Sequence, residues 1–156
     1  MSDHFKKGSI IAERAYAQGK MLDHSSWPIS PSGRTFSDID AVFDNRGSLI
    51  FVEFARSDLP ISWSSISTGQ RWLYQSALEN KQGSIAVLAC HNVPSDRQID
   101  TMKDITHASA MSHDFKTETS LTNKQWVQVV TTWDLSPQAA CDVITKIHGE
   151  QSGGDA

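Results

Sequence analysis

The sequence lacks the features that mark several classes of protein. Its two cysteines, Cys90 and Cys141, lie far apart and form neither a disulfide framework nor a zinc-binding spacing. No apolar run approaches the roughly 18 residues that a membrane span requires, and residues 1–7 lack the apolar core of a secretion signal. These absences predict a cytoplasmic protein that has no membrane partner.

An excess of basic charge is also missing. The chain has 14 Lys and Arg against 18 Asp and Glu, a formal net charge of −4. This balance argues against broad phosphate binding, which basic surfaces drive. The objection is limited, because bound metal would neutralise acidic residues and a local basic patch is sufficient. Candidate residues for that patch are Lys6, Lys7, Arg14, Lys20, Arg34, Arg56, Arg71 and Lys81.

The length and composition that remain are those of an ordinary globular protein. A chain of 156 residues, with 38% hydrophobic and 21% charged residues, fits one domain with a substantial core. We assign residues 1–150 to this domain. The tail over residues 151–156 contains Gly and Ser, and we expect it to be disordered.

Hydrophobic periodicity and capping signals predict a series of helices and strands. The expected elements are a helix over 9–18, a loop over 22–36, a hairpin over 37–54, a loop over 57–66, a helix over 69–80 that begins at Ser67-Thr68, a buried strand over 84–90, a short helix at 95–98, a strand over 125–133, and a helix from Ser136-Pro137 to Gly149. Residues 106–116 give no clear signal. The order fits an α/β domain of three layers, in which helices flank a central mixed β-sheet.

The expected hairpin carries the most informative pattern of the chain. Two apolar runs meet at a turn around Asn45-Arg46-Gly47, and each contains a carboxylate, Asp40 in the first run and Glu53 in the second. A register that places Asp40 opposite Glu53 also places Asp44 opposite Leu49, which leaves a loop of four residues. Opposed side chains share a face, with Cβ atoms roughly 5 Å apart.

Two like charges at that distance repel each other, so their presence indicates a cation between them. Carboxylates that converge from neighbouring strands suit a hard divalent ion, and the predicted cofactor is one or two Mg²⁺ ions, for which Mn²⁺ can substitute. Asp38 shares a face with Asp40 and is either the true ligand or a surface residue, of which we favour the second. The opposing interpretation is that Asp40 and Glu53 are themselves solvent-facing strand residues.

At these residues the chain resembles the PD-(D/E)XK nuclease superfamily. Asp40 is followed 13 positions later by Glu53-Phe54-Ala55, where the superfamily has Asp, a hairpin and then Glu-x-Lys. Gln70 and Tyr74 match the Gln-x-x-x-Tyr motif that one branch carries on the following helix. The resemblance covers somewhat more than half of the chain. It implies a restriction-endonuclease-like fold, and Glu13 on the first helix as an additional metal ligand.

The chain departs from the superfamily at its lysine position, which is Ala55. Residues 53 and 55 point to the same face of a strand, so a lysine there would reach the metal and the attacking water. Arg56 points to the opposite face and cannot replace it. The chain is a nuclease disabled at this position, a nuclease that uses Gln70 or Lys81 instead, or a degenerate nuclease that only binds. We favour the first, because Asp40 and Glu53 are intact.

The predicted chemistry is hydrolysis of phosphodiester bonds. Metal held by Asp40, Glu53 and Glu13 would polarise the scissile phosphate and lower the pKa of a bound water, and the resemblance implies that the carbonyl of Phe54 completes the coordination. Gln70 would position the site. The residues expected to contact nucleic acid are Tyr74, Arg71, Arg56, Lys20 and Arg34, and the alternative for Tyr74 is that it packs behind Gln70. We assign Trp63, Trp72, Trp126 and Trp133 to the core, although Trp27 and Trp63, in loops, could stack on bases.

The sequence therefore predicts a magnesium-dependent DNA endonuclease of homing or phage type, disabled at Ala55. Its substrate would be double-stranded or branched DNA. Cleavage of both strands would require a homodimer or a higher homo-oligomer, because one site cuts one strand. The alternatives are a Holliday-junction resolvase and a non-catalytic module that binds DNA or protein on a nuclease fold.

Overall fold

The computed structural model describes residues 39–79 and 81–154. The chain divides into two compact units, the first of Met1–Ser37 with Pro94–Gln98 and the second of Asp38–Val93 with Ile99–Ala156. In the described part of the first unit, the backbone N–H of Arg97 donates to the carbonyl of Pro94 (3.1 Å), which closes a turn. The sheet and its helices belong to the second unit.

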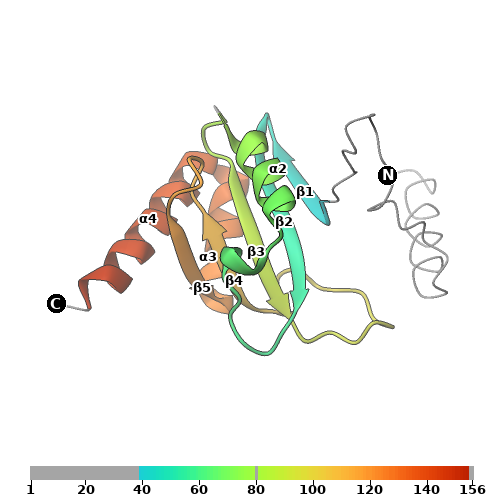
Figure 1. Ribbon diagram of the computed structural model, residues 1–156. Helices are drawn as coiled ribbons and strands as arrows, with labels where there is room; N and C mark the ends of the chain where they lie inside the picture. The colour runs from blue at the N-terminus through green and yellow to red at the C-terminus, as the bar shows by residue number, and fades with distance from the viewer. Residues whose placement is uncertain (1–38, 80, 155–156) are drawn as a thin grey trace, which may run out of the picture. The chain divides into compact units, whose positions relative to one another are not determined.

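The second unit is an α/β structure built on a mixed sheet of five strands (Figure 1). Its elements are β1 (Ala41–Asn45), β2 (Ser48–Arg56), the short 3₁₀ helix η1 (Trp63–Ser65), α2 (Thr68–Leu78), β3 (Ile85–His91), β4 (Ile105–Met111), β5 (Glu118–Thr122), α3 (Asn123–Leu135) and α4 (Pro137–Gly153). The strands lie in the order β1-β2-β3-β4-β5. Only the β2–β3 pair is parallel, and α2 lies in its connection.

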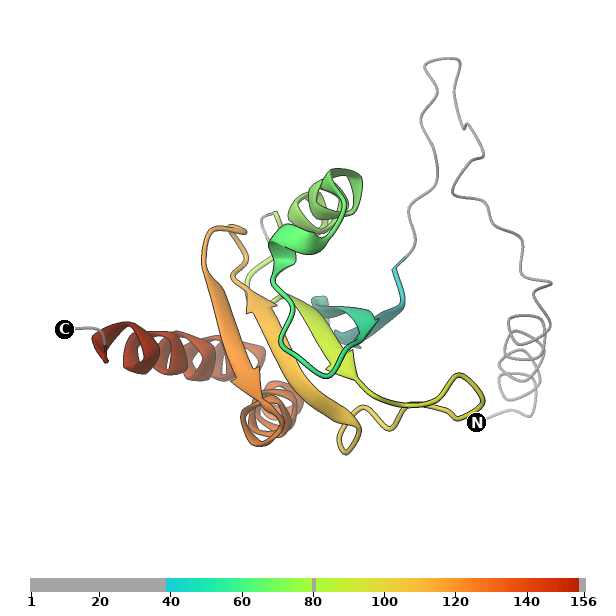
Figure 2. The same cartoon turned by 60° about the horizontal axis from the view of Figure 1, so that its bottom comes forward.

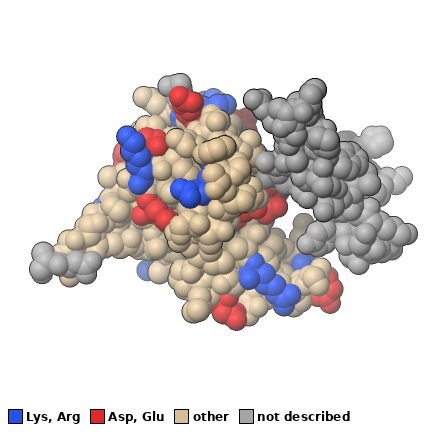
Figure 3. Space-filling view, viewed as in Figure 1, with Lys and Arg blue, Asp and Glu red and all other residues tan. Residues whose placement is uncertain are grey.

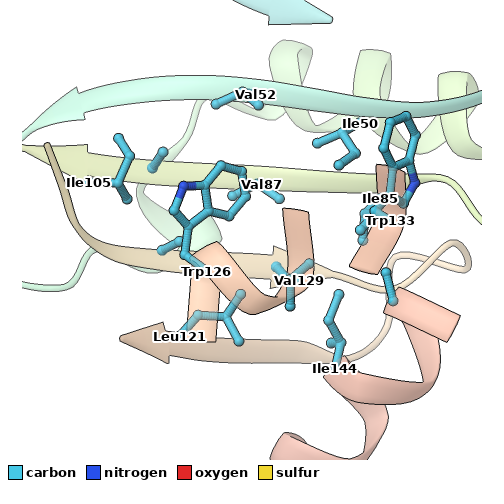
Figure 4. Packing of buried hydrophobic residues seen from close by; sticks show 14 of the residues in the cluster. Ile50, Val52, Ile85, Val87, Ile105, Leu121, Trp126, Val129, Trp133 and Ile144 are labelled. Atoms are coloured by element: carbon cyan, nitrogen blue, oxygen red, sulfur yellow. The ribbon is translucent and has the colours of Figure 1, made fainter. Parts of the chain in front are cut away.

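The helices cover opposite faces of this sheet, as Figure 2 shows for α2 on one side and α3 with α4 on the other. Alternation along β2 and β3 explains the two apolar faces, since successive side chains of a strand point in opposite directions. Phe51 and Leu88 pack with Tyr74 and Leu78 of α2. On the other face, Ile50, Val52, Ile85 and Val87 pack with Trp126, Val129, Trp133 and Ile144 of α3 and α4 (Figure 4).

The predicted hairpin is confirmed, including its register. Ala41 pairs with Val52 and Asp44 with Leu49. Asn45 also pairs with Ser48, so the loop has two residues rather than the four expected. Both loop residues have positive φ, 54° at Arg46 and 94° at Gly47, which is the geometry of a type I′ turn.

The predicted buried strand and the helix that begins after Ser67 are also confirmed. β3 is buried at every position except His91, because helices cover both of its faces. The side chain of Ser67 caps α2 by accepting the backbone N–H of Gln70. The helix ends at Leu78, two residues earlier than expected.

Other predictions were wrong. Residues 125–133 form part of helix α3 and not a strand, because Thr122 and Gln125 form a capping box and buried residues recur at helical spacing. Residues 95–98 form a turn rather than a helix. Strand β4 falls almost entirely in the segment over 106–116 that gave no clear signal, and β5 was not among the expected elements. Helix α4 begins at Pro137 as predicted but continues to Gly153, so residues 151–153 are helical rather than disordered.

The tryptophans follow the sequence interpretation with one exception. Trp63, Trp126 and Trp133 are buried, which removes Trp63 as a residue that could stack on bases. Trp72 is 67% exposed, because it lies on the side of α2 that faces away from the sheet. Within the described residues, no helix combines the length and apolar character that crossing a membrane requires.

Candidate functional site

The end of the β1–β2 hairpin places two carboxylates on neighbouring strands. Asp40 comes directly before β1, and the pairing of Ala41 with Val52 extends by one position to Asp40 and Glu53. The Oδ2 atom of Asp40 accepts the backbone N–H of Phe54 (2.8 Å). This hydrogen bond takes the place of one to a backbone acceptor at the end of the β1 ladder. It ties Asp40 to Phe54, the residue that follows Glu53 in β2.

Two side chains from α2 hold the other carboxylate. Gln70 Nε2 donates to Glu53 Oε1 (3.0 Å), and the Tyr74 hydroxyl donates to Glu53 Oε2 (2.6 Å). Residues four apart lie on one face of a helix, and the Ser67 cap sets where that helix begins. The Gln-x-x-x-Tyr motif therefore supplies one donor to each oxygen of the glutamate.

Aromatic packing fixes the ring of Tyr74, which is fully buried. Its centroid lies 5.2 Å from that of Trp63 and 6.1 Å from that of Phe51, both in edge-to-face geometry. The Trp63 indole N–H donates to the carbonyl of Ser109 on β4 (2.8 Å), so the indole is itself anchored. The sequence placed Trp63 in the core or, as a loop residue, in contact with bases, and gave it no part in orienting Tyr74. The number of residues between Trp63 and Tyr74 did not indicate that their rings would be in contact.

The environment of Tyr74 keeps its hydroxyl protonated. Burial raises the pKa of Tyr74 far above its usual value, and the hydrogen bond to Glu53 and the negative charges of Glu53 and Asp40 raise it further. Tyr74 therefore donates a hydrogen bond to Glu53. Its burial excludes the expected contact with DNA and leaves the alternative, that it packs within the site.

Ala55 lies two positions after Glu53 on β2 and packs on the α2 side of the sheet. It pairs with Cys90 of β3, whose thiol is buried, and this burial raises the pKa of Cys90. Arg56 is exposed and falls at the alternate position of the strand. Lys81 follows the C-terminal end of α2, whereas Gln70 lies in its first turn. Lys81 therefore lies beyond the far end of α2 from Glu53, whereas Gln70 contacts Glu53 directly but carries no charge.

The remaining predicted site residues fall into two groups. Arg71 is exposed on α2, beside Gln70 in sequence. Glu13, Lys20 and Arg34 lie outside the described residues, as do Asp38 and Trp27. On the face drawn in Figure 3, Lys and Arg side chains are interspersed with Asp and Glu.

The oxygen atoms that could coordinate a metal at this site suit Mg²⁺ only in part. Asp40 and Glu53 supply carboxylate oxygens, and the carbonyl of Phe54 points to the same edge of β2 as its N–H, because a strand residue directs both groups to one side. Over residues 39–79 and 81–154, no three His, Cys, Asp or Glu side chains are grouped closely enough to form a metal site.

Comparisons with protein-family models, curated proteins and solved structures found no match to this chain. The interpretation of the site therefore depends on its own geometry and on the motifs in the sequence.

Proposed function

We propose that the Asp40–Glu53 site binds a divalent metal ion and a nucleic-acid phosphate, on a scaffold for phosphodiester hydrolysis that Ala55 disables. The observation that carries the proposal is the pair of hydrogen bonds from Gln70 and Tyr74 to Glu53. A glutamate needed only for solubility would face water, whereas this one is oriented by two side chains of a packed helix. Orientation of this kind is what a catalytic carboxylate requires.

The residues would divide the work as follows. Asp40 and Glu53 would hold the metal, while Gln70 and Tyr74 fix the direction of the Glu53 oxygens. A bound Mg²⁺ supplies charge stabilisation at the phosphate and lowers the pKa of a coordinated water. In hydrolysis the water oxygen bonds to phosphorus, the bond from phosphorus to the leaving sugar oxygen breaks, and that oxygen takes up a proton. Ala55 provides no cation for this step.

The substrate class that we propose is DNA, cut by an endonuclease of homing or phage type. A resolvase that acts on branched DNA would use the same site. Cleavage of both strands would need two copies of the site, and hence a homodimer.

Replacement of Ala55 by lysine tests the proposal. We expect Ala55→Lys to nick supercoiled plasmid in the presence of Mg²⁺ at a rate about 10²-fold or more above the unchanged protein, the scale of a positioned acid or base. Ala55→Met provides a stem of similar length without charge and should remain inactive. The double variant Glu53→Gln with Ala55→Lys should also be inactive, since it retains the lysine but loses the carboxylate.

A second candidate function is a non-catalytic module that binds DNA. The uncharged side chain at position 55 favours it. If Ala55→Lys folds with an unchanged circular dichroism spectrum yet nicks no faster than the double variant, the hydrolytic proposal fails. Retention of Ca²⁺-dependent DNA binding in that protein would then identify the binding module, and loss of both metal and DNA affinity would exclude both candidates.

A further inference from the structure

A cavity of about 220 Å³ lies between α4 and the sheet. Ile85 at the start of β3 and Thr119 on β5 line it from the sheet, and Cys141, Ile144 and His148 line it from α4. Glu53 contacts α2, on the opposite face of the sheet. The cavity is therefore separate from the carboxylate site. A ligand bound in it would not require the proposed function of that site.

One side chain of this cavity is incompletely satisfied. Thr119 is 1% exposed, and its hydroxyl is the buried side-chain polar atom that has no hydrogen-bond partner within the described part of the chain. Ser120 is exposed and Leu121 packs in the core beside α3 and α4, so alternation along β5 directs Thr119 toward α4 as well. An unpaired buried hydroxyl costs free energy unless another molecule supplies a partner.

The lining of the cavity defines the chemistry of such a molecule. Among the described lining residues there is no Asp, Glu, Lys or Arg. Ile85 and Ile144 provide apolar walls. Burial raises the pKa of the Cys141 thiol, and the charge of Asp142 raises it further, so the thiol stays neutral. Apart from His113 and His148, no lining side chain in the described part of the chain could form an ion pair with a charged ligand, which would lose its hydration on entering.

The volume limits the size of the ligand. Pockets for drug-sized ligands span about 300 to 1,000 Å³, so this cavity accepts a smaller molecule of about one ring. The hydroxyl of Thr119 can donate one hydrogen bond and accept others. A carbonyl oxygen on the ligand would take that hydrogen, and the apolar body would pack against the two isoleucines.

We infer that the cavity between α4 and β5 binds a small, uncharged molecule through a carbonyl group that accepts a hydrogen bond from Thr119. The probe for this inference is benzamide, compared with benzoate and benzamidine, which have similar shape but opposite charges. At pH 8 we expect benzamide to shift the backbone amide resonances of residues that line the cavity. Its dissociation constant should be at least fivefold lower than those of the two charged analogues.

The matched variants are Thr119→Val and Ser120→Ala. Valine keeps the shape of threonine and removes the hydroxyl, so it should raise the dissociation constant of benzamide at least fivefold. Ser120→Ala changes the exposed neighbour on the opposite face of β5 and should leave the constant unchanged. Absence of saturable benzamide binding, equal binding by Thr119→Val, or equal binding of benzoate would each overturn the inference.

A second measurement does not depend on the folding of any variant at Thr119. Saturating benzamide should slow maleimide labelling of Cys141 at least fivefold in a Cys90→Ser background, because Cys141 lines the cavity. Unchanged labelling in the presence of benzamide would contradict the proposed position of the ligand.

Discussion

At the scale of single residues, Glu53 is the centre of the candidate site. Each of its oxygens receives a hydrogen bond from a different side chain of α2, and Asp40 occupies the adjoining strand end. Hydrogen bonds to a charged group contribute about 1.5 to 3 kcal/mol each. The same contacts that would orient a catalytic carboxylate therefore also stabilise the packing of α2 on the sheet.

The ionisation of the Tyr74 phenol reports on its hydrogen bond to Glu53 and on its burial. The folded pKa of Tyr74 lies above its unfolded value of about 10, so its contribution to stability is fully present below pH 10. The contribution is lost as the pH rises further, because only the unfolded chain then ionises. In a Tyr16→Phe variant, which leaves Tyr74 as the sole tyrosine, we expect phenolate absorbance to appear at a much higher pH in the folded protein than in denaturant.

Glu53→Gln serves as the comparison for this titration. Removal of the carboxylate charge should bring the folded titration closer to that of the denatured chain. Identical titration curves for the folded and the denatured protein with Glu53 present would contradict the buried hydrogen bond between Tyr74 and Glu53.

At the scale of secondary structure, α3 shows how a local signal can mislead. Its valines, threonines and tryptophans favour a strand, but its apolar residues recur three and four apart and its start carries a capping box. The Thr122 side chain accepts the Gln125 N–H, and the Gln125 side chain accepts the Thr122 N–H. These two hydrogen bonds satisfy backbone donors that a helix end otherwise leaves unpaired.

Removal of this cap should have a measurable cost. We expect Thr122→Ala to lower the free energy of unfolding by about 1 kcal/mol, the usual value of an N-cap, as measured by urea denaturation. Thr131→Ala is the control. Thr131 lies inside the same helix, and its hydroxyl donates to the carbonyls of Val127 and Gln128 rather than capping the helix end. Equal effects of the two substitutions would show that the capping box does not stabilise α3.

At the scale of the second unit, side-chain hydrogen bonds connect the end of β1 at the hairpin turn to α3. The Asn45 side chain donates to the carbonyls of Trp133 and Asp134, each at 3.0 Å. These carbonyls belong to the last turn of α3, where backbone acceptors lack partners within the helix. One side chain thus connects the edge strand β1 to the helical layer that covers the sheet.

Loss of this connection should weaken the second unit. Asn45→Ala removes two hydrogen bonds, and we expect it to lower the free energy of unfolding by about 1 to 2 kcal/mol. Asn45→Asp keeps the shape but places a negative charge against two carbonyls, so it should cost at least as much. A stability unchanged in both variants, measured by thermal and urea unfolding, would show that the contact contributes nothing.

Much of the candidate site could be predicted from local sequence. The spacing of Asp40 and Glu53 around a turn with Gly47 predicted the hairpin register, because the length of the turn sets which residues of the two strands pair. The spacing of Gln70 and Tyr74 placed both on one face of α2. That both donate to Glu53 was not predictable, since it depends on how α2 lies over β2.

Turn, periodicity and capping signals act over a few neighbouring residues, so the hairpin, the buried strand β3 and the starts of α2 and α4 follow from the primary structure alone. Residues 125–133 carry local signals for a helix and for a strand, and the packing of Trp126, Val129 and Trp133 against the sheet selected the helix. The outward direction of Trp72, the inward direction of Trp63 and the burial of Thr119 in a cavity likewise came from the folded chain. Each of these depends on contacts between segments far apart in the chain. Burial against such a segment outweighs an intrinsic preference that amounts to less than about 1 kcal/mol per residue.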